Sequence, residues 1–212
     1  MTAGIAKALY LICTVVWYVI RYPHERRAWR SPVRRTARSA RDRLGVGAAV
    51  LGFGVIPVVY VSTRFLRAAD RTFIPTLAWL GLLVFAAGIW LNYRTHRDLG
   101  RNFSPSLDVR PEHTLVTTGI YAYMRHPMYT AFWLWAIAQA LLLPNWVAGF
   151  SGLVGFGTLY FLRIGREERL MLETFGERYR DYMSRTARLV PRFRSSCYTA
   201  ADSDTKFGSD GP

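Results

Sequence analysis

Cysteine and acidic residues are scarce in this chain of 212 residues. Its two cysteines, Cys13 in an apolar stretch and Cys197 in a polar tail, provide neither a disulfide framework nor the ligand spacing of a metal site. The chain has 14 Asp and Glu residues against 28 Lys and Arg, a formal net charge of +14. Its 15% aromatic content argues against a disordered polycation, and its 51% apolar content argues against a soluble nucleic-acid-binding protein.

Long parts of the sequence also lack charge, and the apolar residues gather there. Five such stretches are 17 to 22 residues long, and only Lys7 interrupts them: residues 4–20, 44–61, 72–93, 127–143 and 146–162. As helices they would be about 25 to 33 Å long, enough for a hydrocarbon layer of roughly 30 Å. We interpret the first stretch as a span and not as a cleaved signal peptide, because Arg21-Tyr22-Pro23 lacks the small-residue cleavage pattern.

The basic residues indicate how these spans are oriented. The connection at residues 21–43 holds nine arginines and two acids, so it carries half of the excess charge and belongs on the cytoplasmic side. Residues 94–126 and the region from Arg163 onward then lie on the same side, and residues 62–71 lie outside. An arm that binds nucleic acid is the alternative interpretation, but only Tyr22 and Trp29 could stack on bases. We therefore expect no nucleic-acid partner and an integral protein of the plasma (inner) membrane.

The predicted fold is all-α: a polytopic membrane protein of about five transmembrane helices with a cytoplasmic amphipathic C-terminal helix. Residues 1–93 are expected to form a three-span region, residues 94–194 a second region with two spans, and residues 195–212 a polar tail that we expect to be disordered. The C-terminal helix is predicted to continue from Arg163 and to end before Pro191. Its apolar side chains recur at helical spacing: Leu172, Phe175, Tyr179, Tyr182 and Met183.

Polar residues that could perform chemistry are concentrated in two predicted cytoplasmic stretches. In the first, Pro127 fits the first turn of a helix, which places His126 near the N-cap. Unpaired N–H groups there could receive an anionic group. The alternative is that Arg125, His126 and Tyr129 only anchor the helix at the membrane interface.

In the second stretch, Arg163 and Glu167 lie four residues apart and share a helix face at the membrane boundary. A guanidinium held by a carboxylate could bind an anionic group in bidentate fashion. The alternative is a solvated ion pair that contributes only a few tenths of a kcal/mol.

These residues form motifs that resemble the isoprenylcysteine carboxyl methyltransferase family, within a wider group of membrane methyltransferases that includes phospholipid N-methyltransferases. The resemblance covers about residues 100–193. It rests on three strings in order: His113-Thr-Leu-Val-Thr-Thr-Gly-Ile-Tyr121, Arg125-His-Pro-Met-Tyr129, and Arg163 followed by Glu167-Glu168 and Phe175-Gly-Glu-Arg-Tyr179. Two departures are Thr130-Ala131, where many members have a glycine, and Gly165-Arg166, which interrupts an acidic run.

The resemblance implies a helical membrane enzyme that binds S-adenosyl-L-methionine in a cytoplasm-facing pocket. The residues implied to bind this cofactor are His113, Thr114, Leu115, Val116, Tyr121, Arg125, His126, Pro127, Met128 and Tyr129. Arg163 and Glu167 match the pair at the methyl-accepting group, with Glu168 as a neighbouring candidate.

Several acceptors satisfy the chemistry of methyl transfer from a sulfonium, which mainly needs alignment. A carboxylate reacts without losing a proton, a lipid amine needs Glu167, Glu168 or His126 as a base, and a thiol reacts as thiolate. We favour the carboxylate of an isoprenylcysteine-like group on a membrane lipid or prenylated acceptor. Other candidate functions are a nicotinamide-dependent sterol-type reductase and a non-enzymatic interaction protein.

Overall fold

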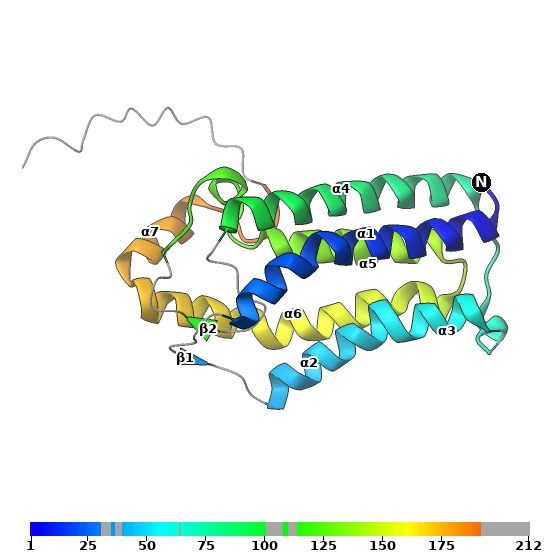
Figure 1. The fold of residues 1–212 in the computed structure, drawn as a ribbon, viewed down its shortest axis with the longest axis horizontal. Coiled ribbons are helices and arrows are strands. Elements are labelled where there is room, and N and C mark those ends of the chain that lie inside the picture. Colours follow the sequence, from blue (N-terminus) through cyan, green and yellow to red (C-terminus); the bar gives the residue numbers. More distant parts are fainter. Residues whose placement is uncertain (31–34, 37–39, 64, 101–107, 110–113, 192–212) are drawn as a thin grey trace, which may run out of the picture.

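Four long apolar helices form most of the molecule (Figure 1). The structure is a computed structural model that describes residues 1–30, 35–36, 40–63, 65–100, 108–109 and 114–191. Within these ranges, four helical stretches are long and apolar enough to cross a membrane: Ala3–Arg27, Ala40–Ser62, Pro75–Leu99 and Trp146–Phe175. The first stretch is α1 (Ala3–Arg30). The second consists of three elements in series, α2 (Ala40–Val50), η1 (Leu51–Val55) and α3 (Ile56–Ser62). The third is α4 (Pro75–Leu99) and the fourth is α6 (Trp146–Phe175). The predicted all-α membrane fold is confirmed. The described residues also include two strands of two residues each, β1 (Arg35–Thr36) and β2 (Asp108–Val109), which pair in antiparallel orientation.

The remaining predicted span forms α5 (Pro127–Leu142), a helix of 16 residues. At 1.5 Å per residue its length is about 24 Å, less than the roughly 30 Å hydrocarbon layer. It packs mainly against α4 and α6, and most of its side chains are partly or fully buried. The sequence showed no charge in this segment, but it did not show that the segment would be a short helix at the centre of the bundle.

Aromatic rings fill the space around α5. Trp135 is fully buried, and its ring centroid lies 4.8 Å from that of Trp17 on α1, 4.4 Å from Phe53 on η1 and 5.7 Å from Phe85 on α4. Aromatic pairs at such distances contribute about 0.5 to 1.5 kcal/mol each beyond the burial of their area. Three other membrane segments therefore pack on one side chain of α5.

Glycines let α2 and η1 approach α6 closely. A Cβ atom at Gly52 would lie 2.3 Å from the Ser151 oxygen, and one at Gly155 would lie 2.3 Å from the Ala48 oxygen. In contrast, a Cβ atom at Gly47 or Gly54 would meet no atom within 4 Å. The close packing of the second span is thus made within the chain, with small residues along the seam between the helices.

Loops gather at the two ends of the bundle, as the charge pattern predicts. In Figure 1 the N-terminus and the loop after α3 lie at one end, and the start of α2, the end of α4 and α7 (Glu177–Arg185) lie at the other. At the first end, the Arg71 side chain donates to the Ala140 and Leu143 carbonyls, which terminate α5. Arg71 therefore has local partners at the end of the bundle that the charge pattern predicts to lie outside.

The predicted single C-terminal helix is wrong in one respect. The helix that includes Arg163 is the last part of α6, and it ends at Phe175 because Gly176 adopts φ 55°. The chain then turns into α7, where Tyr179 and Tyr182 are buried. The Tyr182 hydroxyl donates to the Tyr121 carbonyl at 2.6 Å, which fixes α7 against the segment before α5. The apolar pattern was correctly recognised, but it belongs to two helices.

Candidate functional site

The site begins at the N-terminus of α5. Pro127 occupies the first turn and His126 is the N-cap residue, as the sequence predicts. The backbone N–H groups of Arg125 and His126 donate to the Ala187 and Arg188 carbonyls at 2.8 and 3.1 Å. These two donors therefore hold the chain segment after α7, and the anion binding expected of this helix end stays a prediction.

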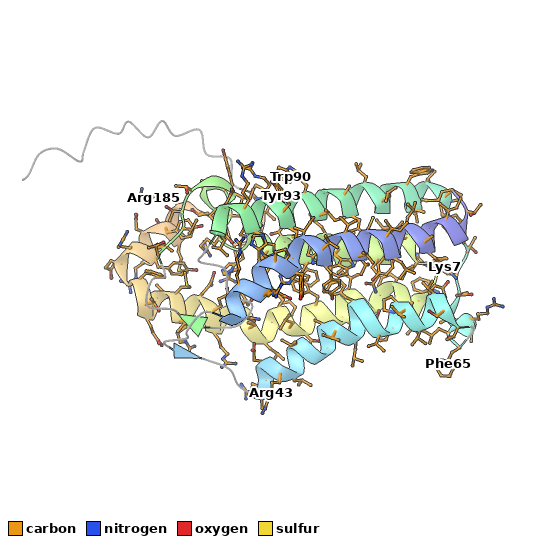
Figure 2. All side chains as sticks on the ribbon, viewed as in Figure 1. Lys7, Arg43, Phe65, Trp90, Tyr93 and Arg185 are labelled. Carbon is orange, nitrogen blue, oxygen red and sulfur yellow. The ribbon has the colours of Figure 1, made fainter. Side chains whose placement is uncertain are left out.

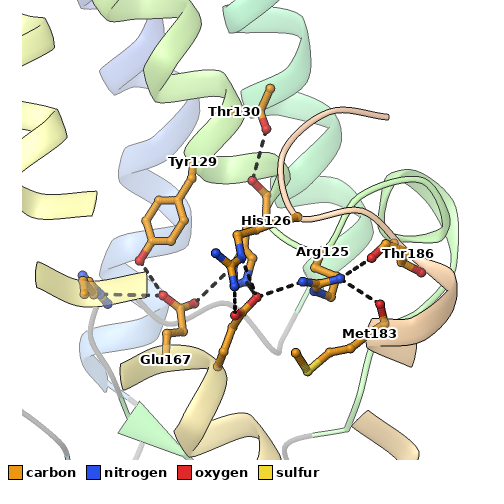
Figure 3. Close-up of polar contacts among 10 residues, drawn as sticks. Arg125, His126, Tyr129, Thr130, Glu167, Met183 and Thr186 are labelled. Carbon is orange, nitrogen blue, oxygen red and sulfur yellow. Dashed lines mark hydrogen bonds and ion pairs between the residues drawn. The ribbon is translucent and has the colours of Figure 1, made fainter. Parts of the chain in front are cut away.

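Glu168 on α6 is the centre of a buried ion cluster (Figure 3). Its carboxylate lies 3.1 Å from Arg125 Nη2 and 3.3 Å from His126 Nε2, and it accepts two hydrogen bonds from Arg188. Arg125 also donates to the Met183 and Thr186 carbonyls at the end of α7. One acidic side chain thus joins α5, α6 and the segment after α7.

Glu167, the adjacent acid, faces the aromatic side of the site. The Tyr129 hydroxyl donates to Glu167 Oε2 at 2.5 Å, and His126 Nδ1 lies 4.0 Å from Glu167 Oε1 (Figure 3). The Tyr129 and His126 rings are stacked with centroids 5.5 Å apart. His126 therefore lies between two consecutive carboxylates, with one ring nitrogen directed to each.

Arg163 lies one helical turn before Glu167 and is 9% exposed. Its Nε atom lies 3.9 Å from Glu167 Oε2, so the predicted Arg163–Glu167 pair is present. The same Nε atom lies 3.9 Å from Oδ1 of Asp42 in the first turn of α2. A residue of the second span therefore enters the site beside Arg163.

Six of the residues selected from the sequence come together: Arg125, His126, Tyr129, Arg163, Glu167 and Glu168. Tyr121 lies beside this group in η4 (Gly119–Ala122), bound to α7 through its carbonyl, and burial raises the pKa of its hydroxyl. Met128 instead faces α1, where Arg21 Nη1 lies 3.5 Å from its sulfur.

The upstream motif is only partly visible. Thr114 is exposed and Leu115 and Val116 are half-buried, whereas His113 lies outside the described residues. The tail at residues 195–212 also lies outside them. The structure therefore leaves their proposed contribution to the cofactor site as a prediction.

Sequence reasoning missed Asp42 and Arg188. Asp42 was counted only as a charge in the basic connection, although it is 7% exposed. Arg188 follows α7, and its hydrogen bonds to Glu168 raise the pKa of its guanidinium. Its position three residues before Pro191 was the only available signal. With both included, the part of the site that the structure describes has three arginines and three acids, whose formal charges cancel.

Comparisons with known proteins agree with the motifs. Residues 79–173 match the sequence model of the isoprenylcysteine carboxyl methyltransferase (ICMT) family, a range that includes most of α4, all of α5 and most of α6.

Individual proteins that are similar to this chain have names that agree with the family description. The chain is 32% identical over 113 residues to protein-S-isoprenylcysteine O-methyltransferase of Dictyostelium discoideum, which is 50% of this chain and 46% of the relative. It is 31% identical over 131 residues to protein-S-isoprenylcysteine O-methyltransferase B of Arabidopsis thaliana (58% and 66%), and 32% identical over 120 residues to the Homo sapiens protein (54% and 42%). The chain thus spans about half the length of these curated relatives. Residues 79–173, which contain Tyr129, Arg163 and Glu167, are therefore the part of the chain that is similar to the isoprenylcysteine carboxyl methyltransferase family.

Proposed function

We propose that this protein is a membrane methyltransferase that transfers a methyl group from S-adenosyl-L-methionine to the carboxylate of an isoprenylcysteine-like acceptor. The observation that carries the proposal is the cluster of Tyr129, Arg163 and Glu167 within the matched region, in which Tyr129 and Arg163 are buried. The names of the relatives support a carboxyl O-methyltransferase. The bundle of apolar helices supports a lipid-borne acceptor.

The residues present fit the methyl donor. S-adenosyl-L-methionine carries a sulfonium, an ammonium and a carboxylate, so its site needs acidic groups, an aromatic face and a basic group. Glu167, Tyr129 and Arg125 are such groups, and all three lie at the junction of α5 and α6. We assign the donor to Tyr129 and Arg125 together with the rest of the set that the resemblance implies: His113, Thr114, Leu115, Val116, Tyr121, His126, Pro127 and Met128. Glu167 is assigned, with Arg163, to the acceptor.

The donor, when bound, supplies an electrophilic methyl group, whose carbon bonds to the acceptor oxygen while the carbon–sulfur bond breaks and its electron pair stays on sulfur. Arg163 is assigned to the acceptor carboxylate, which it would bind and orient as a permanent cation. Glu167 holds Arg163 and Tyr129, and Glu168 holds His126 and the segment after α7. The protein's main contribution would be alignment in a site with little water.

Charge balance supports a carboxylate as the acceptor. Among the described residues of the site, the formal charges of three arginines and three acids cancel, so this part of the site does not favour an unpaired ion. A carboxylate and a sulfonium enter together as a neutral pair, and an ester and a thioether leave as neutral products. Their charges annihilate in the reaction, which a low-dielectric site favours.

A lipid amine acceptor is supported less well. An amine must lose a proton, and the nearby candidate bases are Glu167, Glu168 and His126. Glu167 already accepts from Tyr129, and Glu168 is bound by two arginines beside His126. Both carboxylates are therefore already engaged by a hydroxyl or by cations, and the arrangement favours an acceptor that needs no base.

The charge distribution supports a site that faces the cytoplasm. The cluster lies at the end of the bundle where Arg43 and Arg185 lie, opposite the end that carries Lys7 and Phe65 (Figure 2). Because cytoplasmic connections carry the excess of arginine, this end is assigned to the cytoplasmic face of the plasma (inner) membrane.

Three measurements on detergent-purified protein test this function. Calorimetry should detect binding of S-adenosylhomocysteine, and binding of NADPH alone would indicate a reductase. Labelled S-adenosyl-L-methionine should methylate N-acetyl-S-farnesylcysteine but not phosphatidylethanolamine. Alkali should release the label as methanol, since esters hydrolyse whereas N-methyl and thioether groups do not; an alkali-stable product would contradict carboxyl transfer.

A further inference from the structure

Asp42 belongs to the half of the chain in which no motif was found, yet its side chain reaches Arg163. We infer that Asp42 is a positioning residue for the methyl transfer, holding the Arg163 guanidinium in the orientation in which it meets the acceptor anion. This inference rests on the proposed function, because it needs an anionic acceptor at Arg163.

The geometry shows two carboxylates at one atom. Asp42 Oδ1 and Glu167 Oε2 each lie 3.9 Å from Arg163 Nε, and they come from different helices. Glu167 is four residues from Arg163 on α6, and such a pair is compatible with several rotamers of two long side chains. A second carboxylate fixed on α2 adds a constraint that α6 alone lacks.

Burial shows that Asp42 is more than a favourable charge at a helix end. An acid in the first turn of a helix is stabilised by the helix dipole, and an exposed acid has this benefit too. Asp42 is 7% exposed, whereas its neighbours Arg41 and Arg43 are exposed. Burial of a carboxylate is unfavourable unless a cation compensates it, and Arg163 is that cation.

The seam between α2 and α6 holds Asp42 at a defined position. Asp42, Gly45 and Gly52 lie three and seven residues apart on one face of the helix. A Cβ atom at Gly45 would lie 3.0 Å from the Leu159 Cα atom, and Gly52 and Gly155 make the closer approaches described above. Because backbone contacts backbone here, α2 has little freedom to slide or rotate against α6.

This arrangement predicts opposite changes in two kinetic constants. Asp42→Asn keeps the size of the side chain and removes its charge, so Arg163 becomes a less compensated cation and an anionic acceptor binds more tightly. The guanidinium then loses one of the two carboxylates described beside it and is aligned less well. We expect KM for N-acetyl-S-farnesylcysteine to fall and kcat to fall at least about tenfold, since small misplacements of reacting groups cost factors of ten to a hundred.

The experiment compares wild type, Asp42→Asn and Asp42→Glu, with kcat expressed per S-adenosylhomocysteine-binding site so that misfolded protein does not contribute. Asp42→Glu, which restores the charge on a longer side chain, should recover part of the lost kcat. The control is Asp181→Asn, which removes an exposed acid paired with Arg185 on α7 and should leave both constants unchanged.

The outcomes separate this inference from the proposed function. A wild type without methyl transfer to the probe overturns both. An active wild type with the same kcat and KM in Asp42→Asn overturns the role of Asp42 alone, and so does a loss of folded sites with unchanged constants per site. If Asp42→Asn yields no folded protein, Asp42→Glu decides: a kcat lowered several-fold supports the inference and a wild-type kcat contradicts it.

Discussion

Arg188 donates two hydrogen bonds to Glu168, which precedes it by 20 residues and lies on α6. The segment after α7 is thereby fixed over the N-terminus of α5, where it also accepts from the backbone of Arg125 and His126. The Glu168 carboxylate therefore stabilises the segment after α7 and also lies beside the proposed cofactor site.

Removal of the Glu168 charge should destabilise the protein more than removal of Arg188. Arg188 is half-exposed and Arg125 remains beside Glu168 after its loss, so Arg188→Gln should cost about 1 kcal/mol. Glu168→Gln leaves buried Arg125 without its carboxylate and should cost about 3 kcal/mol. Thermal unfolding in detergent measures both, with Arg180→Gln on the exposed surface of α7 as the control. Equal losses for the two variants would contradict the central place of Glu168.

Arg163→Ala should abolish methyl transfer and leave cofactor binding nearly intact. The guanidinium is assigned to the acceptor, and its loss removes the cation that aligns the carboxylate. Arg163→Lys keeps the charge but not the planar fork, so it should retain only a small part of kcat. Calorimetry with S-adenosylhomocysteine and initial rates would measure the two effects separately. Weakened cofactor binding with normal turnover at saturation would reverse the assignment.

Tyr129→Phe tests the hydroxyl that donates to Glu167. The substitution keeps the ring that stacks on His126 and removes one hydrogen bond to a charged group, which contributes about 1.5 to 3 kcal/mol. Glu167 would then hold Arg163 less firmly, so kcat should fall about tenfold with a small change in cofactor affinity. Tyr123→Phe is the matched control, because Tyr123 is exposed. A loss of cofactor affinity with unchanged kcat would place the hydroxyl at the donor.

Alanine substitutions at two glycines of the second span should change the stability of the protein in opposite directions. A Cβ atom at Gly52 would lie 2.3 Å from the Ser151 oxygen, so Gly52→Ala must separate the helices and should cost about 1 to 3 kcal/mol. A Cβ atom at Gly47 would meet no atom within 4 Å, and Gly47→Ala should stabilise the helix by about 0.5 to 1 kcal/mol. Thermal unfolding of the two variants measures these changes in stability. Similar losses of stability at both positions would show that the effect does not come from close packing between α2, η1 and α6.

The sequence predicted what depends on local pattern. Uncharged stretches identified the segments that enter the membrane, and Pro127 identified the start of α5 and the N-cap position of His126. The i, i+4 spacing identified the pair of Arg163 and Glu167, because a helix brings such residues to one face whatever surrounds it.

What the sequence did not predict depends on tertiary packing. An apolar stripe continues through Phe175 and Tyr179, and nothing in its spacing showed that Gly176 would adopt a positive φ and separate two helices. Asp42 and Arg163 are 121 positions apart, and only the docking of α2 on α6 brings them together. Arg188 likewise contacts Glu168 only because the segment after α7 packs back against α6.

The glycine seam also fixes the rotation of α2 about its own axis, and this rotation determines whether Asp42 points toward Arg163. Each residue of an α-helix advances about 100° around the axis. One residue inserted between Asp42 and Gly45, with Gly45 still packed at Leu159, would turn the Asp42 carboxylate by about that angle away from Arg163. An insertion before Ala40 leaves this rotation unchanged. The connection before α2 can therefore vary in length, whereas the three-residue spacing from Asp42 to Gly45 cannot.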